Sequence, residues 1–346
     1  MNAMLVKSAY HDAGEGCIRY LLKHLNANGA FDYVYHPADG VMGDKYNLLR
    51  HAGTLYALFQ WHHLMGQPVP PVLDSGVSYL SAYIQPIGDV PHVSTLVYKG
   101  EAKLGGAALA LLMYTELYKT SGSRRYLKTM RSLAEFLLWM QQPSGRFLSK
   151  YLVTERGFSP FESVYYPGEA MLALLRLYQI DPDPRWLQSV MDGAGHLLRY
   201  PVMEGRVRGH NHWFATALAE LYLVQPDQAY YDELWSIAQA TLDSIPRRIK
   251  KGDSSASLAT VGETAVAVLL LELRLKRADR IREALSAVDN VLAYCLQLQV
   301  REGDFSSNAA WGGIMHDATK QSIRIDYVQH TLQVIAGRLL SDRLAG

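Results

Sequence analysis

The chain has 346 residues, of which 49% are hydrophobic, and its 34 lysines and arginines nearly balance its 33 aspartates and glutamates. This composition is typical of a globular protein, and the balanced charge gives no support for nucleic acid or an anionic membrane as a partner. Cys17 and Cys295 are too far apart for a CxxC pair, which argues against a thiolate zinc site and favours a reducing compartment. Because the N-terminus lacks a signal-peptide core and no apolar run approaches the roughly 20 residues that span a bilayer, we expect a cytoplasmic protein.

Apolar residues recur at intervals of three and four along nearly the whole chain, which predicts a mostly helical protein. The predicted helices alternate between two kinds. Helices with one charged face, typical of surface helices, are expected at residues 11–25, 72–84, 123–141, 184–200, 229–245 and 278–299. Helices that are apolar or small nearly all round, and so need neighbours on every side, are expected at residues 46–61, 103–118, 167–180, 210–224, 262–275 and 325–340.

This alternation indicates a repeat of helical hairpins with a period of about fifty residues. Gly53, Gly105, Gly168 and Gly262 would let the inner helices approach closely, since glycine has no side chain. Hairpins that are adjacent in sequence are neighbours in space, so six of them can close into a ring. We therefore predict an all-α fold, an (α/α)6 toroid, as a single domain over residues 1–346. An open solenoid would need polar capping repeats, but the last inner helix is as apolar as the others.

The connections that enter the inner helices are longer than those that leave them, notably residues 29–45, 145–166 and 303–324. They contain aromatic residues and isolated glycines rather than low-complexity sequence. Long ordered loops in a compact domain are usually functional. We expect them to form short β-hairpin-like loops on one face of the toroid.

Two phrases, YYPGEAMLALLRLY from Tyr165 and HNHWFATALAELY from His210, carry a resemblance to a known superfamily. With the hairpin architecture, they resemble the six-hairpin toroid enzymes: glycoside hydrolases, unsaturated uronyl hydrolases, and sugar epimerases of the N-acylglucosamine 2-epimerase and glucuronyl C5-epimerase kinds. The resemblance covers nearly the whole chain and matches no single family. It implies a carbohydrate-active enzyme whose ligand cleft lies at the N-terminal ends of the inner helices.

Polar and aromatic residues gather at those helix starts in all six hairpins. The acid/base candidates are Glu169, Asp326, His51, His212 and His330. The predicted substrate-binding residues are Asp44, Lys45, Asn47, Arg50, Glu162, Tyr166, His210, Trp213, Glu263, Arg324 and Gln329. Among these, Arg50 and Lys45 are the expected anion contacts.

Each residue also has a structural interpretation. Glu169 and Glu263 would favourably meet a helix dipole in a first turn, and Asp44 and Asp326 suit helix caps. A lone histidine on an apolar helix is commonly a core group, and Trp213 could serve packing alone. Arg50 is harder to explain structurally, because a guanidinium within an apolar helix needs partners for its charge. The recurrence at six helix starts is the argument for a pocket.

Three functions remain open on these residues. A glycoside hydrolase acting on an acidic or amino-sugar glycan would use a protonated and an ionised carboxyl, and it is our first prediction. A sugar epimerase would use paired histidines, with Arg50 or Arg324 holding an enediolate oxygen. A non-catalytic carbohydrate- or peptide-binding module is the third. At a helix start, His210 and His212 diverge by about 200°, so we predict no metal, and no cofactor motif is present.

Overall fold

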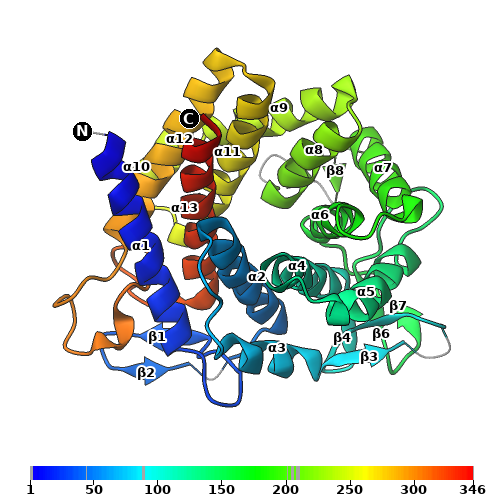
Figure 1. Ribbon diagram of the computed structural model, residues 1–346, viewed down its shortest axis with the longest axis horizontal. Coiled ribbons are helices and arrows are strands. Elements are labelled where there is room, and N and C mark those ends of the chain that lie inside the picture. The colour runs from blue at the N-terminus through cyan, green and yellow to red at the C-terminus, as the bar shows by residue number, and fades with distance from the viewer. Residues whose placement is uncertain are drawn as a thin grey trace. The chain divides into compact units, whose positions relative to one another are not determined.

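The computed structural model describes residues 3–43, 45–87, 90–200, 202–203, 206–207 and 211–345. Its residues gather in two compact units, which we describe one at a time (Figure 1). Unit 1 comprises Met1–Gly76 and Ala238–Gly346, and unit 2 comprises Val77–Ile237. The divisions fall inside helices α3 (Leu73–Ser81) and α9 (Gln228–Leu242). The prediction of a single domain stays a prediction.

Unit 1 is organised around helix α13, which packs against α1, α2 and α11, while α12 covers α11. The helices of this unit are α1 (Ala3–Lys23), α2 (Leu48–Met65), α10 (Ile245–Lys251), α11 (Ser255–Leu275), α12 (Ala278–Gln297) and α13 (Ile325–Ala345), with a 3-10 turn at Asn308–Ala310. Helix α13 is buried on nearly all sides, as its apolar sequence predicts. Its first turn is therefore set among residues of α2 and α11.

Unit 2 repeats the same arrangement around helix α6, which lies between α4 and α8 in Figure 1 and contacts both. Helices α5 and α7 cover α4 and α6. The helices of this unit are α4 (Leu104–Ser121), α5 (Leu127–Trp139), α6 (Tyr166–Tyr178), α7 (Pro184–Arg199) and α8 (His212–Val224), with a 3-10 turn at Arg124–Tyr126. In each unit, buried helices thus alternate along the chain with partly exposed ones.

Small antiparallel sheets form from the three connections that were expected to carry hairpin-like loops and from residues 84–103, which were not named among them. In unit 1 the strand order is β10 (Ile323–Arg324), β1 (Val34–His36) and β2 (Val41–Met42). In unit 2 a five-stranded sheet runs in the order β3 (Ile84–Pro86), β4 (Ser94–Tyr98), β5 (Glu101–Lys103), β6 (Lys150–Leu152) and β7 (Gly157–Phe158). A separate pair joins β8 (Val202–Met203) and β9 (Arg206–Val207).

The predicted alternation of outer and inner helices is confirmed, with three main differences. Helix α1 begins at Ala3, eight residues before the predicted start at His11. Helix α11 begins at Ser255, seven residues before the predicted start, because the Ser254 hydroxyl accepts a hydrogen bond from the Ser257 N–H at 3.3 Å and caps it there. Glu263 therefore lies in the third turn of α11, and its predicted first-turn placement is wrong. The short helix α10 was not predicted; it ends at Gly252 in the left-handed conformation.

Close approach of the inner helices through glycine is confirmed within each unit. A Cβ on Gly168 of α6 would lie 2.5 Å from the backbone nitrogen of Phe214 on α8. A Cβ on Gly53 of α2 would lie 2.8 Å from Oε1 of Gln329 on α13. A larger residue at Gly168 would therefore press on the backbone of α8, whereas one at Gly53 would displace the end of the Gln329 side chain.

Helix α11 differs in one respect from the expectation that no segment is long and apolar enough to cross a bilayer. Its 21 residues pass that test by length and composition. However, 67% of its most apolar segment is buried inside the protein. This burial is typical of a core helix, and α11 packs against both α12 and α13.

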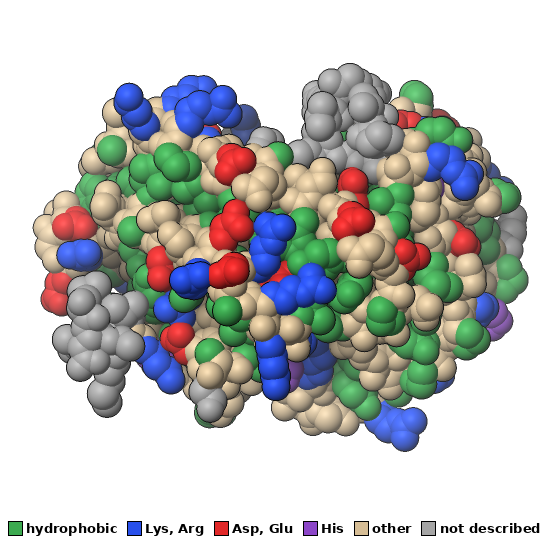
Figure 2. Space-filling model, turned by 90° about the horizontal axis from the view of Figure 1, so that it is seen from above, with side chains coloured by type: hydrophobic (Ala, Val, Ile, Leu, Met, Phe, Trp, Pro, Cys, Tyr) green, Lys and Arg blue, Asp and Glu red, His purple; other side chains and the backbone are tan. Residues whose placement is uncertain are grey.

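Charged side chains of both signs lie next to one another over the face shown in Figure 2. This mixture agrees with the near-equal numbers of basic and acidic residues in the sequence. Recognition of a ligand must then depend on local groups of side chains.

Candidate active site

The main group of predicted site residues in unit 1 forms where α2 and α13 begin. Strand β10 leads directly into α13, and its pairing of Arg324 with Val34 of β1 sets the direction of the helix start. Asn47 caps α2, where its Oδ1 accepts hydrogen bonds from the Leu49 and Arg50 N–H groups at 3.0 and 3.3 Å. Arg50 is therefore placed in the first turn of α2, facing the first two turns of α13.

Asp326 is the buried anion of this group, with 1% of its side chain exposed. Arg324 donates from Nε and Nη2 to its two carboxylate oxygens, the second bond being 2.7 Å long. Arg50 Nη1 lies 3.4 Å from Oδ2 of the same carboxylate. Burial alone would raise the pKa of Asp326, but the Arg324 hydrogen bonds and the Arg50 and Arg324 charges lower it overall. Asp326 is therefore ionised at neutral pH.

His330 lies one turn further along α13, in contact with Glu263 and Arg50. Its Nδ1 is 2.9 Å from Glu263 Oε1, and its Nε2 is 3.4 Å from Arg50 Nη1. A guanidinium can only donate, so the Arg50 contact fits a lone pair on Nε2, and the proton on Nδ1 is then donated to Glu263. The side chains of His330 and Glu263 are 5% and 9% exposed, whereas that of Arg50 is 40% exposed. The buried carboxylate of Glu263 thus fixes the orientation of the His330 ring.

Two tyrosines that were not among the predicted site residues pack against Arg324. The Arg324 guanidinium lies over the ring of Tyr327 at 4.6 Å and over that of Tyr33 at 5.9 Å. Burial is the main cause that raises the pKa of both hydroxyls, so both remain protonated donors. Tyr327 follows Asp326 directly, which was an available signal; Tyr33 lies in a connection with no motif around it.

Arginines and carboxyl groups are equal in number in this group, which we call the His330 cluster (Arg50, Glu263, Arg324, Asp326 and His330). Arg50 and Arg324 contribute two guanidinium groups, and Asp326 and Glu263 contribute two carboxyl groups. The cluster therefore combines a basic nitrogen, Nε2 of His330, with a partly exposed cation, Arg50, at 3.4 Å. A base beside a cation suits proton removal from a carbon whose neighbouring oxygen becomes negative.

His51 has a different environment from His330, although both were acid/base candidates. It is fully buried; its Nδ1 is 2.6 Å from the Tyr46 hydroxyl and its Nε2 is 3.0 Å from the Gly76 carbonyl oxygen. Burial lowers the pKa of His51 to about 4. With both nitrogens engaged, these contacts favour a structural role for His51.

The structure also shows where three other predicted residues of unit 1 lie. The side-chain oxygen of Asn47 is used by the helix cap, which favours the structural interpretation. Lys45 is exposed just before α2. Gln329 is 2% exposed, and its Nε2 donates to Gln333 Oε1 at 3.1 Å, within the contact between α13 and α2. Asp44 and His210 lie outside the described residues.

In unit 2 the predicted residues lie around the start of α6 and α8. Glu169 is 5% exposed and packs with Tyr166 against Gly105 of α4. His212 and Trp213, the first residues of α8, are 4% and 6% exposed, with their ring centroids 5.0 Å apart. Glu162 forms an ion pair with Arg146. Their roles in catalysis or binding stay predictions, as does the absence of a metal or cofactor.

Comparison with known proteins relates the chain to carbohydrate-active enzymes by structure. No family model matches the sequence, and no curated protein matches it. Among solved structures, it is similar to the GH76A alpha-1,6-mannanase from Salegentibacter sp. HEL1_6, with a TM-score of 0.70, 13% identity, and coverage of 96% of this chain and 99% of that one. It is equally similar to the cellobiose 2-epimerase from Bacillus thermoamylovorans B4167, with a TM-score of 0.70, 12% identity and the same coverage.

A third similar structure is a D-mannose isomerase, with a TM-score of 0.71, 13% identity, and coverage of 98% of this chain and 99% of that one. At these identities the likeness shows the fold alone. The structures are (α/α)6 toroid enzymes, so the predicted fold class is confirmed. Their names include both hydrolysis and sugar isomerisation, and the choice between these reactions depends on the residues of this chain.

Proposed function

We propose that this protein is a carbohydrate-active enzyme of the isomerase or epimerase kind, which moves a proton at the carbon next to the carbonyl of an open-chain sugar. The observation that supports this most is the geometry at His330. Its Nδ1 is held by Glu263 at 2.9 Å, and its Nε2 lies 3.4 Å from Arg50. A positioned base with an adjacent cation is what enolisation of a sugar requires.

The chemistry follows from these three side chains. His330 Nε2 takes the proton from the carbon beside the carbonyl, and the C–H electron pair forms a carbon–carbon double bond. The carbonyl oxygen gains the negative charge and is stabilised by Arg50, while Glu263 stabilises the imidazolium. Return of the proton from His330 to the neighbouring carbon, with transfer of the hydroxyl proton between the two oxygens, gives the aldose–ketose isomer. Return to the opposite face of the first carbon requires a second base and gives the epimer.

The residues of the His330 cluster support proton transfer more directly than the hydrolysis that was our first prediction. Glycosidic cleavage needs a protonated carboxylic acid at the leaving oxygen. Asp326 is held ionised by two arginines, and Glu263 accepts the hydrogen bond of His330. Asp326 is therefore not the acid, and hydrolysis would need its acid from another predicted carboxyl, such as Glu169 or Glu162. The balanced charge of the cluster also favours a neutral sugar over an acidic one, because Arg50 and Arg324 already face anions.

The test is proton NMR of the protein in D2O with mannose, glucose, fructose, cellobiose, glucuronic acid and alpha-1,6-mannobiose. Proton transfer predicts that the H2 signal of at least one neutral reducing sugar is lost, with a new ketose or epimer and no new reducing end. His330→Gln should abolish the exchange. His24→Gln is the matched control, because His24 is also buried beside a carboxylate, 3.1 Å from Asp32, outside the cluster. Cleavage of the disaccharides without exchange would support hydrolysis instead.

A further inference from the structure

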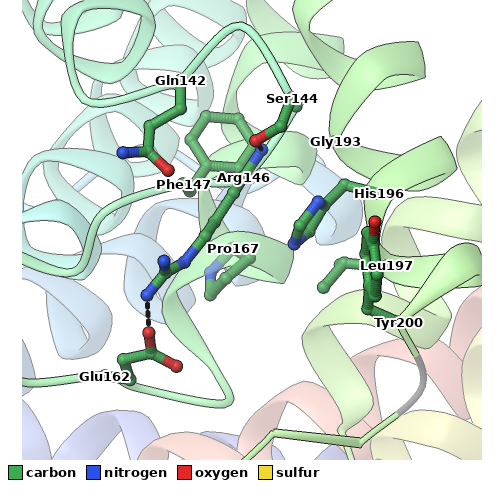
Figure 3. Close-up of a pocket in the computed structure, with 11 residues that line it drawn as sticks. Gln142, Ser144, Arg146, Phe147, Glu162, Pro167, Gly193, His196, Leu197 and Tyr200 are labelled. Carbon is green, nitrogen blue, oxygen red and sulfur yellow. Dashed lines mark hydrogen bonds and ion pairs between the residues drawn. The ribbon is translucent and has the colours of Figure 1, made fainter.

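Unit 2 contains a pocket of about 460 Å³ that none of the chemistry above uses. It lies between the turn that follows α5, the last turns of α7 and the start of α6 (Figure 3). Its lining residues are Gln142, Ser144, Gly145, Arg146, Phe147, Glu162, Pro167, Gly193, His196, Leu197 and Tyr200. All of them belong to unit 2, whereas the His330 cluster belongs to unit 1.

The wall formed by the turn is fixed to α7 by close packing and hydrogen bonds. Gly145 adopts φ +83°, and a Cβ there would lie 2.2 Å from the Asp192 carbonyl oxygen, so only glycine allows this approach. Just before the turn, the Gln141 side chain donates to the Ser189 carbonyl at 2.9 Å and accepts from the Ser189 hydroxyl at 2.6 Å. The pocket is therefore preformed rather than assembled by a ligand.

An ion pair between Arg146 and Glu162, which we call the polar arm, crosses one side of the pocket. The Arg146 side chain extends toward Glu162, with which it forms an ion pair, as Figure 3 shows. The two side chains are 41% and 24% exposed, so both remain accessible to a ligand. Their charges cancel, while their planar ends still offer several donors and acceptors in fixed positions. This pattern suits a ligand with many hydroxyl groups and no net charge.

An aromatic wall faces this arm. Tyr200 is 53% exposed, and its ring lies 4.9 Å from that of His196, one turn earlier in the chain, with Leu197 beside them (Figure 3). An aromatic ring left half open to solvent is a frequent binding contact, since it offers apolar area at little cost in side-chain freedom. The C–H face of a sugar ring is a matching partner.

We propose that this pocket binds one unit of a neutral saccharide, which stacks on Tyr200 and hydrogen-bonds to the Arg146–Glu162 pair. The choice of a sugar rests in part on the proposed function; the preference for an uncharged polyhydroxyl ligand follows from the pocket alone. The substrate class is then an oligosaccharide.

The test is isothermal titration with methyl β-cellobioside and methyl alpha-1,6-mannobioside, which have no free carbonyl and cannot be turned over at the His330 cluster. Tyr200→Ala should raise the Kd of the better ligand about tenfold. Phe158→Ala is the matched control, because Phe158 is 47% exposed in the same unit and does not line the pocket. Absence of binding to both glycosides, or equal weakening by the two variants, overturns the proposal.

Charge provides a second test. Glu162→Gln leaves the Arg146 guanidinium without its counter-charge, so this variant should gain affinity for methyl glucuronide that the wild-type protein lacks. Tighter binding of methyl glucuronide than of the neutral glycosides by the wild type would contradict a neutral-saccharide site. His330→Gln abolishes turnover but should leave the neutral glycosides bound with unchanged Kd. Failure of the isomerase proposal is therefore distinguishable from failure of this one.

Discussion

Replacing Glu263 with Gln tests whether His330 is the base. In the reaction proposed above, His330 becomes an imidazolium while Glu263 Oε1 lies 2.9 Å from its Nδ1. With charge centres about 4 Å apart and an effective dielectric of about 20, the lost attraction is about 4 kcal/mol. Because this attraction arises only as charge develops, we expect kcat to fall about 10³-fold with little change in KM.

The assay is the rate at which the H2 signal of a saturating reducing sugar disappears in D2O. Glu272→Gln is the matched control, since Glu272 is a fully buried glutamate on the same helix and lies outside the cluster. Thermal melting of both variants checks that the fold is kept. If Glu263→Gln melts normally and retains more than a tenth of the wild-type kcat, the assignment of His330 as a base oriented by Glu263 is refuted.

Three further predictions concern charge and stability. Arg50→Met should reduce kcat about 10²- to 10³-fold while melting stays cooperative, because the Arg50 side chain is 40% exposed. Arg176→Met should lower the free energy of unfolding in urea by about 3 kcal/mol, because Arg176 binds Glu116 at 3.4 Å and Glu220 at 2.8 Å and Glu116 is 2% exposed. Burial lowers the pKa of His51 to about 4, so His51 is neutral in the folded protein above that pH. Because the unfolded chain binds this proton at about pH 6.5, the free energy of unfolding should fall by about 3 kcal/mol as the pH drops from 6.5 to 4. His51→Gln should remove this pH dependence.

Each of these has a contrary outcome. Unfolding of Arg50→Met at room temperature would make that residue part of a structural network. A urea midpoint of Arg176→Met equal to that of the wild type would show that its two carboxylate contacts add nothing to stability. Equal pH slopes for the wild type and His51→Gln would mean that other groups cause the acid sensitivity. Urea melts at pH 7, 5.5 and 4 measure this last comparison.

The fold was largely predictable because the apolar pattern of each helix shows which of its faces must be buried. A helix that is apolar all round, such as residues 103–118, cannot face water on any side, and this alone placed α4 inside unit 2. The start of α11 was missed because the polar residues 255–261 resemble a connection, and tertiary packing with the cap at Ser254 decided otherwise.

The candidate site was predictable in residue type and less so in role. Arg50 was selected because a charge within an apolar helix needs partners, and it contacts Asp326 and His330. The role of the neighbouring residue, His51, could not be inferred from that of Arg50, since successive residues on a helix point about 100° apart. His51 accordingly faces Tyr46 and the Gly76 carbonyl.

The sequence by itself determined the helical class, the alternation of inner and outer helices, and the polar residues at the inner helix starts, because each follows from periodicity within a few turns. Only the tertiary structure decided which of those residues meet. Arg50, Glu263 and His330 are separated by 213 and 67 residues along the chain, and no local pattern couples them. Their contact depends on how α2, α11 and α13 pack, and that packing is what makes one histidine a base and leaves another in the core.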